Sequence, residues 1–193
     1  MKIDRKGITV YCGSGLGTSS IFSSAAETVG NEIARLGLPL IYGGGHMGMM
    51  GAVGRAVRAA GGETIAVIPD FMVKRGWNDT HASHTIITPS MHIRKETMAS
   101  NAVGVIALPG GIGTWEELCE IITWRQLGLY HGNIVILNLE GYYDNFLAQF
   151  NRAVVDGFFL KSHLSLFCVV SDPTEAVKKA AQPLDDEYIP PKF

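Results

Sequence analysis

The clearest sign of chemistry in this chain is the nine-residue run PGGIGTWEE at 109–117. It follows an apolar run at 103–108 and opens a helical pattern over 115–127, which predicts a strand, a glycine turn and a helix. Glycines let the backbone bring bare N–H groups close to a ligand, and a helix start adds unpaired N–H donors and a positive dipole end. Such a turn favours an anion, most plausibly a phosphate. Because Glu116 and Glu117 follow directly, the pattern predicts chemistry on a nucleotide or a sugar phosphate.

The spacing leaves two explanations open for Glu117. Thr114-x-x-Glu117 has the pattern of a capping box, in which Thr114 caps the helix and Glu117 reaches back to the first N–H. Alternatively, the carboxylate acts on a ligand at the mouth of the predicted crevice, and one side chain can fill both roles at different times. Glu116 has the simpler explanation of a first-turn acid that the helix dipole stabilises.

A candidate cation comes from residues 90–95, SMHIRK, where Ser90 is expected to cap another helix. Met91, Arg94 and Met98 share one helix face by their spacing. An arginine between apolar neighbours needs an anionic partner or a ligand. Either Arg94 acts on a ligand, or it forms an ion pair with a purely structural role. Lys95 and His92 point away from this face and are expected on the solvated surface.

Two further glycine clusters follow the first two predicted strands, GSGLGT at 13–18 and GGGHMG at 43–48. The carboxyl ends of parallel strands meet at one edge of a sheet, so we expect all three clusters to face one crevice. Gly13 and Ser14 are therefore candidate substrate contacts. The second cluster also matches G-x-G-x-x-G, which leaves a dinucleotide-dependent oxidoreductase as an alternative, although the match follows the second strand rather than the first.

Apolar runs that alternate with helical patterns predict the frame that positions these residues. Strands are expected at 7–12, 39–42, 63–69, 85–88, 103–108, 133–139 and 166–170, and helices at 19–36, 47–60, 90–101, 115–127, 142–156 and 174–180. Strands that are apolar on both faces indicate a parallel sheet covered on both sides. The predicted fold is α/β, a doubly wound, Rossmann-like parallel sheet with helices on both faces. One domain is expected over 1–182, with a loosely held tail at 183–193.

Composition narrows the classes of function. The chain has 193 residues, a net charge of −2 and no basic stripe, which argues against nucleic acid and anionic membranes as partners. The start of the chain does not look like a signal peptide, and no apolar stretch reaches the length of a membrane span. Cys12, Cys119 and Cys168 lie in apolar segments and are expected to be buried thiols in a reducing, cytoplasmic setting. The histidines lack ligand spacing, so no metal site is expected.

Taken together, these motifs resemble the LOG ("Lonely Guy") family, cytokinin riboside 5′-monophosphate phosphoribohydrolases that are often mislabelled as lysine decarboxylases. The resemblance runs from about residue 8 to residue 170. Residues 109–117 fit the family's PGGxGTxxE motif at every fixed position, and residues 91–95 fit MHxRK. Residues 43–51 look like GGGxxGLMG, with Met49 in place of leucine, and residues 120–128 fit E-x-I-T-W-x-Q-L-G.

The resemblance implies that Arg94 and Glu117 are a catalytic pair. The implied reaction hydrolyses the N-glycosidic bond of a nucleoside 5′-monophosphate, either a cytokinin riboside 5′-monophosphate or AMP, to the free base and ribose 5-phosphate. It implies no cofactor and no metal, and it implies a homodimer. Besides Gly13 and Ser14, the expected substrate contacts are Met91, Lys95, Gly111, Ile112, Gly113, Thr114, Trp115, Glu116 and Thr123.

One segment departs from the family pattern. Many relatives carry Gly-Arg-Glu shortly after the third strand, whereas this chain has Lys74-Arg75-Gly76-Trp77. The missing acid and the added bulk of Trp77 leave the base preference open. They also leave open a non-catalytic nucleotide or cofactor carrier of the same fold, similar to the molybdenum-cofactor carrier proteins.

Overall fold

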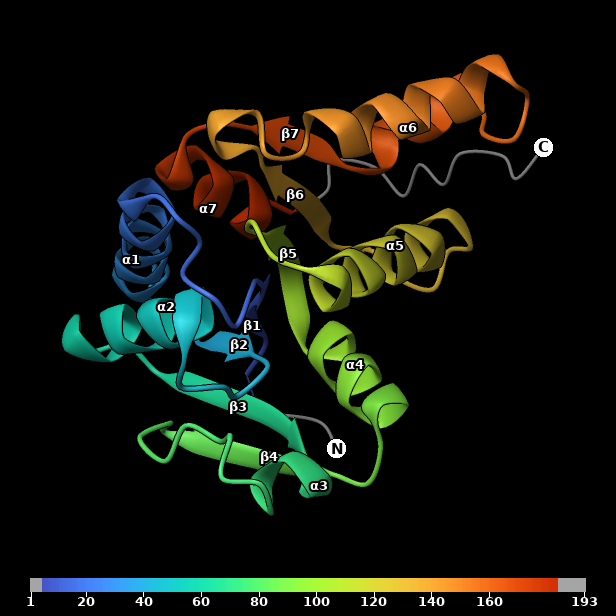
Figure 1. Cartoon of the computed structure of the whole chain (residues 1–193). Coiled ribbons are helices and arrows are strands. Elements are labelled where there is room, and N and C mark those ends of the chain that lie inside the picture. The colour runs from blue at the N-terminus through green and yellow to red at the C-terminus, as the bar shows by residue number, and fades with distance from the viewer. Residues whose placement is uncertain (1–4, 184–193) are drawn as a thin grey trace.

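The computed structural model describes residues 5–183, in which a seven-stranded parallel sheet carries helices on both faces (Figure 1). The strands are β1 (Gly7–Tyr11), β2 (Leu40–Tyr42), β3 (Thr64–Pro69), β4 (His84–Thr88), β5 (Ala102–Ala107), β6 (Asn133–Leu137) and β7 (Cys168–Val170). Their order is β4-β3-β2-β1-β5-β6-β7, and every neighbouring pair is parallel. The predicted doubly wound α/β fold is confirmed, and the direction of winding changes between β1 and β5, where such folds bind ligands.

Seven α-helices and two short 3-10 helices connect these strands within residues 5–183. The α-helices are α1 (Ser20–Arg35), α2 (Gly48–Ala59), α3 (Asp70–Val73), α4 (Met91–Ser100), α5 (Ile112–Gln126), α6 (Asp144–Val155) and α7 (Pro173–Ala181). The 3-10 helices are η1 (Leu139–Gly141) and η2 (Lys161–Leu166). Helices α1, α2 and α7 cover one face of the sheet, and α4 and α5 cover the other (Figure 1).

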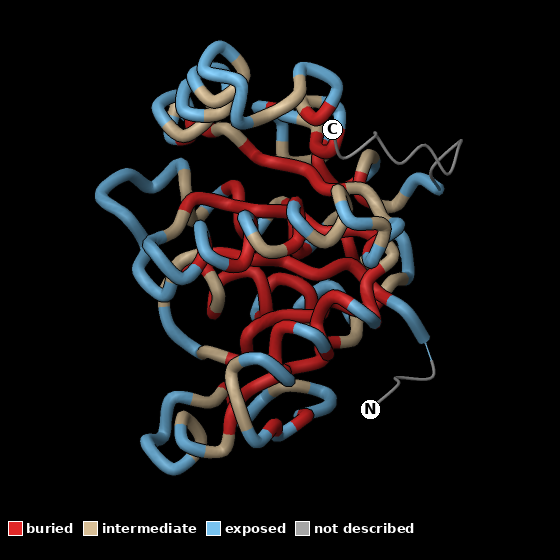
Figure 2. Tube along the Cα trace, turned by 90° about the vertical axis from the view of Figure 1, so that its right-hand side faces the viewer, coloured by how far each residue is buried: buried red, intermediate tan, exposed pale blue. Residues whose placement is uncertain are grey.

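The core lies on both sides of the central strands. Every residue of β1, β2 and β3 is buried, and the tube in Figure 2 is red along the middle of the sheet. A parallel sheet sandwiched between helices requires such continuously apolar strands. On one face Val29 and Ile33 of α1 pack against Val53 of α2, and on the other Met98 of α4 belongs to the same cluster as Leu118 of α5.

The element boundaries differ from the predictions at several places, including α3, η2 and the start of α5. The short helix α3 occupies part of the segment expected to be irregular at 70–84, and η2 occupies the start of the strand expected at 166–170. Helix α5 begins at Ile112, three residues before the expected start. The expected tail lies outside the described residues except for position 183. No helix in the described part of the chain combines the length and apolar character needed to cross a membrane.

Candidate active site

The three glycine clusters meet at the switch point between β1 and β5. The Gly13 N–H donates a hydrogen bond to the Pro109 carbonyl (3.1 Å), and a Cβ placed on Gly13 would lie 3.2 Å from the Gly110 Cα. The Met50 N–H donates to the Gly13 carbonyl (3.2 Å), which joins the second cluster to the first. A Cβ on Gly48 would lie only 2.1 Å from the Ser14 carbonyl oxygen. The three clusters therefore lie together at one edge of the sheet, as predicted, and the first two line a common cavity.

The start of α5 offers an open anion site in this crevice. Gly111 is the N-cap residue of α5 and has an extended backbone conformation. The space beside the turn is open, because a Cβ placed on Gly111 or on Gly113 would meet no atom within 4 Å. Ile112, between them, is 78% exposed. The first N–H groups of an α-helix have no partner within the helix, so this turn presents donors to a bound anion.

Of the two explanations left open for Glu117, the capping box is wrong. Thr114 lies at the third residue of α5 rather than before it, and no side chain caps this helix. The helix begins early because Gly111 takes the extended cap conformation, so Thr114 is carried inward and is buried. Its hydroxyl occupies the space beside Gly110, where a Cβ would lie 2.1 Å away. Glu117 does not reach back to the helix start but faces α4.

Arg94 and Glu117 form a buried ion pair between α4 and α5. Arg94 Nη1 donates to Glu117 Oε1 at 2.7 Å, and the two side chains are only 6% and 9% exposed. Arg94 Nε also donates to the Val67 carbonyl at the end of β3 (3.1 Å). A Cβ on Gly43 would lie 2.0 Å from Arg94 Nη2, so a glycine there is required for the guanidinium to fit. The predicted anionic partner of Arg94 is Glu117.

Burial gives Glu117 the properties of a proton acceptor. Desolvation raises the pKa of Glu117 above its ordinary value, while the charge and hydrogen bond of Arg94 act against that rise. A carboxylate works best as a general base when its pKa lies nearer the working pH than that of a solvated glutamate. The pair therefore combines an activated carboxylate with a fixed cation.

Lys95 is not on the solvated surface, and that prediction is wrong. It is 5% exposed, and its ammonium group donates to Glu116 and, at 3.1 Å, to Glu120. Burial alone lowers the pKa of Lys95, but the hydrogen bonds and charges of the two glutamates outweigh it, so the pKa is raised. Helix α4 thus buries two adjacent cations because it is enclosed by both the sheet and α5. His92 is exposed, as expected.

Two consecutive tyrosines hold the glycine turn before α5 in place, and sequence reasoning missed both. The Tyr143 hydroxyl donates to the Leu108 carbonyl at 2.7 Å, and the Tyr142 hydroxyl donates to the Gly110 carbonyl. The two rings pack edge to face, with centroids 5.0 Å apart. Their place after β6 gave no signal, since nothing in the spacing links them to residues more than thirty positions earlier.

A cavity of about 450 Å³ extends from the Arg94 guanidinium. Its size is in the usual range for small-molecule sites. Ser14 lines it, and so does Trp77, which the sequence analysis connected with base preference. Met47, Met50 and Met72, which sequence reasoning did not select, line it as well. The methionine-rich sequence at 47–50 was the signal available for part of this wall.

The remaining candidates divide into two groups. Met91 lies at the start of α4 and Trp115 in the first turns of α5, both on elements that border the crevice. Thr123 is exposed, its hydroxyl donates to the Cys119 carbonyl of its own helix (2.8 Å), and it lies about 9 Å along α5 from Glu117 at 1.5 Å rise per residue. Within residues 5–183, no hydrogen bond joins Thr123 to the Arg94–Glu117 pair.

The three cysteines differ from the expectation that all are buried. Cys12 is buried and Cys168 is partly buried, but Cys119 is exposed, so the expectation is wrong for Cys119.

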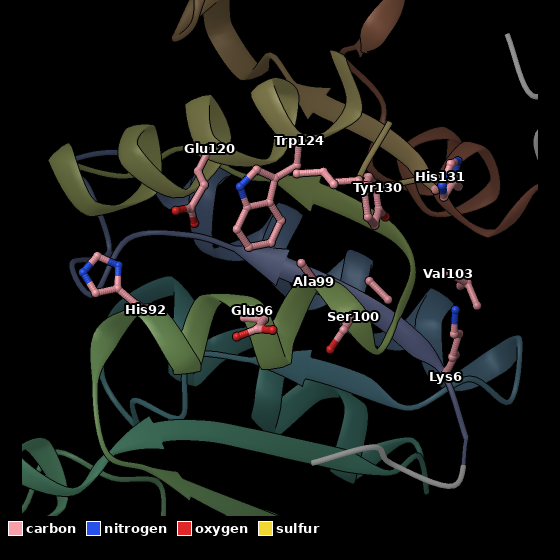
Figure 3. Close-up of a pocket in the computed structure, with 13 residues that line it drawn as sticks. Lys6, His92, Glu96, Ala99, Ser100, Val103, Glu120, Trp124, Tyr130 and His131 are labelled. Atoms are coloured by element: carbon pink, nitrogen blue, oxygen red, sulfur yellow. The ribbon is translucent and has the colours of Figure 1, made fainter. Parts of the chain in front are cut away.

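A second, larger cavity of about 720 Å³ lies between α4 and α5 (Figure 3). Trp124 projects into it from α5 toward Ala99 of α4, and charged residues of both signs border it, including Lys6, Glu96 and Glu120. Because Glu120 also holds Lys95, this groove adjoins the ion pairs. No group of three or more His, Cys, Asp or Glu in residues 5–183 is placed to hold a metal ion.

Comparisons with known proteins point to one family. Residues 50–180 match the family model described as possible lysine decarboxylase. The chain is 40% identical over 185 residues to cytokinin riboside 5′-monophosphate phosphoribohydrolases from Arabidopsis thaliana and Oryza sativa, covering 95% of this chain and 83% and 74% of those proteins. Among solved structures, it matches a molybdenum cofactor binding protein from Rippkaea orientalis with a TM-score of 0.67, at 21% identity over 91% of this chain and 96% of that one. At that identity, the last likeness shows the fold alone.

Proposed function

Because the chain belongs to the LOG family of cytokinin riboside 5′-monophosphate phosphoribohydrolases, we propose that it hydrolyses the N-glycosidic bond of such a nucleoside 5′-monophosphate. The products are the free base and ribose 5-phosphate. The observation that carries the proposal is the buried Arg94–Glu117 pair: Glu117 lies on α5, which begins at the open glycine turn, and Arg94 lines a cavity of about 450 Å³.

In the proposed mechanism, the 5′-phosphate binds at the start of α5. The N–H groups of Ile112, Gly113 and Thr114 are its donors, with Gly13 and Ser14 on the facing turn. Hydrogen bonds to a charged group contribute about 1.5–3 kcal/mol each, so three would anchor the nucleotide and fix its C1′ atom. Glu116 and Lys95 are proposed to contact the ribose side of the site, and Met91 and Trp115 to border it.

Bond cleavage is assigned to the Arg94–Glu117 pair. The transition state resembles an oxocarbenium ion, as in other glycoside cleavages. Glu117 stabilises the developing positive charge and takes a proton from the attacking water as its oxygen bonds to C1′. Arg94 polarises the substrate, the C1′–N bond breaks, and the departing base leaves with the bonding electrons. The base takes up one proton and Glu117 gives up the one it removed, so that a single water is consumed.

The two alternative functions, a cofactor carrier and a dinucleotide-dependent oxidoreductase, are each supported by fewer observations. The likeness to molybdenum-cofactor proteins is a likeness of fold at 21–23% identity. The dinucleotide-binding pattern at 43–48 has packing reasons for its glycines, since Gly43 makes room for Arg94 and Gly48 for the Ser14 carbonyl. Neither glycine needs a pyrophosphate to explain it.

Incubation with AMP and with N6-isopentenyl-AMP, followed by chromatography of the free bases, tests the proposal. Release of base by the wild type, and its near loss in Glu117→Gln, supports the hydrolase. Binding of either nucleotide without any release of base overturns it in favour of a carrier. Binding of NAD with no binding of either monophosphate supports the oxidoreductase.

The partner and the compartment are also proposed. The α4–α5 groove (Figure 3) pairs acidic and basic side chains with exposed apolar ones such as Leu129, which suits a self-complementary contact between two copies of this chain. Leu129→Glu should then convert a homodimer to a monomer in light scattering, whereas Phe158→Glu, at an 87% exposed position after α6, should not. A monomeric wild type contradicts this.

The three free cysteines fit the reducing cytoplasm as the compartment.

A further inference from the structure

The cavity beside Arg94 has few polar side chains in its lining. They are those of Arg94, Ser14 and His46. The rest of the wall is mostly hydrocarbon, thioether and indole, from Met47, Met50, Met72 and Trp77. If the phosphate lies at α5 and the scissile bond at Arg94–Glu117, the base extends into this cavity.

The apolar wall is held in place by two loops that bind each other. Gly45 and Asn78 form an antiparallel bridge, and the Asp79 N–H donates to the Gly44 carbonyl at 2.6 Å. Asp79 is itself buried and accepts hydrogen bonds from Tyr42 (2.8 Å) and Arg58 (2.9 Å). The loop that carries Trp77 is therefore fixed to the glycine loop after β2.

The side chains of the wall are held as well. Met50 Sδ accepts a hydrogen bond from the Gly45 N–H at 3.1 Å. The Arg75 guanidinium lies over the Trp77 ring at 5.0 Å and over the Phe71 ring at 5.6 Å, which is within cation–π range. Trp77 is thus oriented by Arg75 on one side and lines the cavity on the other.

The polar groups near this wall are few. His46 Nδ1 lies 3.3 Å from the Trp77 carbonyl, so one of its ring nitrogens is engaged by the loop itself. A hydroxyl placed among methionines and an indole would lose its hydrogen bonds to water without replacement, and such a loss is costly. A hydrocarbon substituent in the same place would be favoured, since burial removes apolar surface from water.

We propose that Trp77 is a specificity-determining residue, which makes the site prefer a purine nucleotide whose 6-amino group carries an unsubstituted hydrocarbon tail. Unmodified AMP fills less of the apolar wall, and the same tail with a terminal hydroxyl buries an unpaired polar group. This inference rests on the proposed function, because it places the base in this cavity.

The test compares kcat/KM for N6-isopentenyl-AMP, its terminally hydroxylated analogue and AMP. One methylene in an apolar pocket changes specificity by about 10- to 200-fold, so the five-carbon tail is expected to favour the first substrate over AMP by at least about 10²-fold. Against the hydroxylated analogue the preference is expected to be about tenfold or more. Trp77→Ala should lower kcat/KM for isopentenyl-AMP by about tenfold or more and kcat/KM for AMP by much less, and Trp77→Phe should restore most of the preference.

Phe71→Ala is the matched control, because it removes the other ring under Arg75, and Phe71 does not line the cavity. It should leave the substrate ratios unchanged. Equal kcat/KM for the three nucleotides, or an equal loss on all three in Trp77→Ala, overturns the inference while the hydrolase function stands. Should no nucleotide be hydrolysed, the proposed function fails, and calorimetric binding decides the inference separately: equal Kd values for AMP and isopentenyl-AMP overturn it.

Discussion

Helices α4 and α5 are joined by two neighbouring sets of ion pairs that differ in how much water reaches them. In Arg94–Glu117 both side chains are less than a tenth exposed. In the Lys95 cluster the lysine is just as buried, but Glu116 is 50% and Glu120 26% exposed. Adjacent residues on the same two helices therefore place their charges in different surroundings.

The difference separates an ion pair suited to chemistry from one suited to holding helices together. Charges interact more strongly when water is excluded, and a buried carboxylate is costly unless it is paired. Glu117 depends on Arg94 for that reason, whereas Glu116 and Glu120 can be solvated without Lys95. Loss of a partner should therefore have larger consequences in the first pair than in the second.

Replacing Glu117 and Glu120, one at a time, by glutamine should give the largest difference in turnover between the two sets of ion pairs. Glu117→Gln keeps the shape of the side chain but cannot accept a proton, so kcat should fall by about 10²–10⁴ while AMP still binds. Glu120→Gln, in the exposed cluster, should retain most of the turnover. Steady-state rates of base release and calorimetric binding check both, and comparable turnover in the two variants would remove the distinction.

Removing Arg94 from the buried pair should lower the free energy of unfolding more than removing Lys95 from the exposed cluster. Arg94→Met leaves Glu117 buried without a partner and should lower the free energy of unfolding by about 3–5 kcal/mol. The double variant Arg94→Met/Glu117→Leu should recover much of that loss, because no unpaired charge remains. Urea unfolding measures all three free energies. A double variant as unstable as Arg94→Met would show that packing rather than the charge is responsible.

The pH dependence should report the buried carboxylate. Its pKa is raised above 4.5 by desolvation, and the ionised form is needed, so kcat/KM should fall at acid pH with a midpoint above 4.5. Stability changes in the opposite sense: the contribution of a raised carboxyl pKa is complete below 4.5 and is lost as pH rises through the native-state pKa. An acidic midpoint at or below 4.5 would contradict the assignment of Glu117.

The smallest effect is expected at the exposed cluster. Lys95→Met keeps the long apolar stem and frees two glutamates that water can reach, so the cost in unfolding free energy should be about 1 kcal/mol or less. The same urea titration measures it at low and at high salt. A loss as large as that of Arg94→Met would mean that the two pairs are equivalent in the folded protein.

The fold and the family were predictable because their signals are local. Apolar runs such as 103–108 are followed by glycines and helical patterns, which set both the sheet and its ligand-binding edge. The family membership predicted from residues 91–95 and 109–117 is confirmed by the curated relatives. The need of Arg94 for an anionic partner also followed from its apolar neighbours alone.

The remaining features depend on contacts between distant segments. Lys95 was expected in solvent because its spacing is off the apolar face of α4, and only the position of α5 buries it. The capping-box prediction failed because Gly111, not Thr114, begins the helix. Trp77 could be seen as a departure from the family pattern, but its place in a cavity wall depends on a bridge between Gly45 and Asn78.

The two tyrosines that contact the glycine turn before α5 have a consequence for how binding energy is used. By accepting hydrogen bonds from Tyr142 and Tyr143, the carbonyls of Gly110 and Leu108 fix the turn in the protein itself. Ordering a flexible residue costs about 1–2 kcal/mol, and a turn that is already ordered avoids that penalty. On the proposed function, the turn is therefore a pre-organised receptor, in which contacts with the phosphate go into positioning the sugar rather than into shaping the loop.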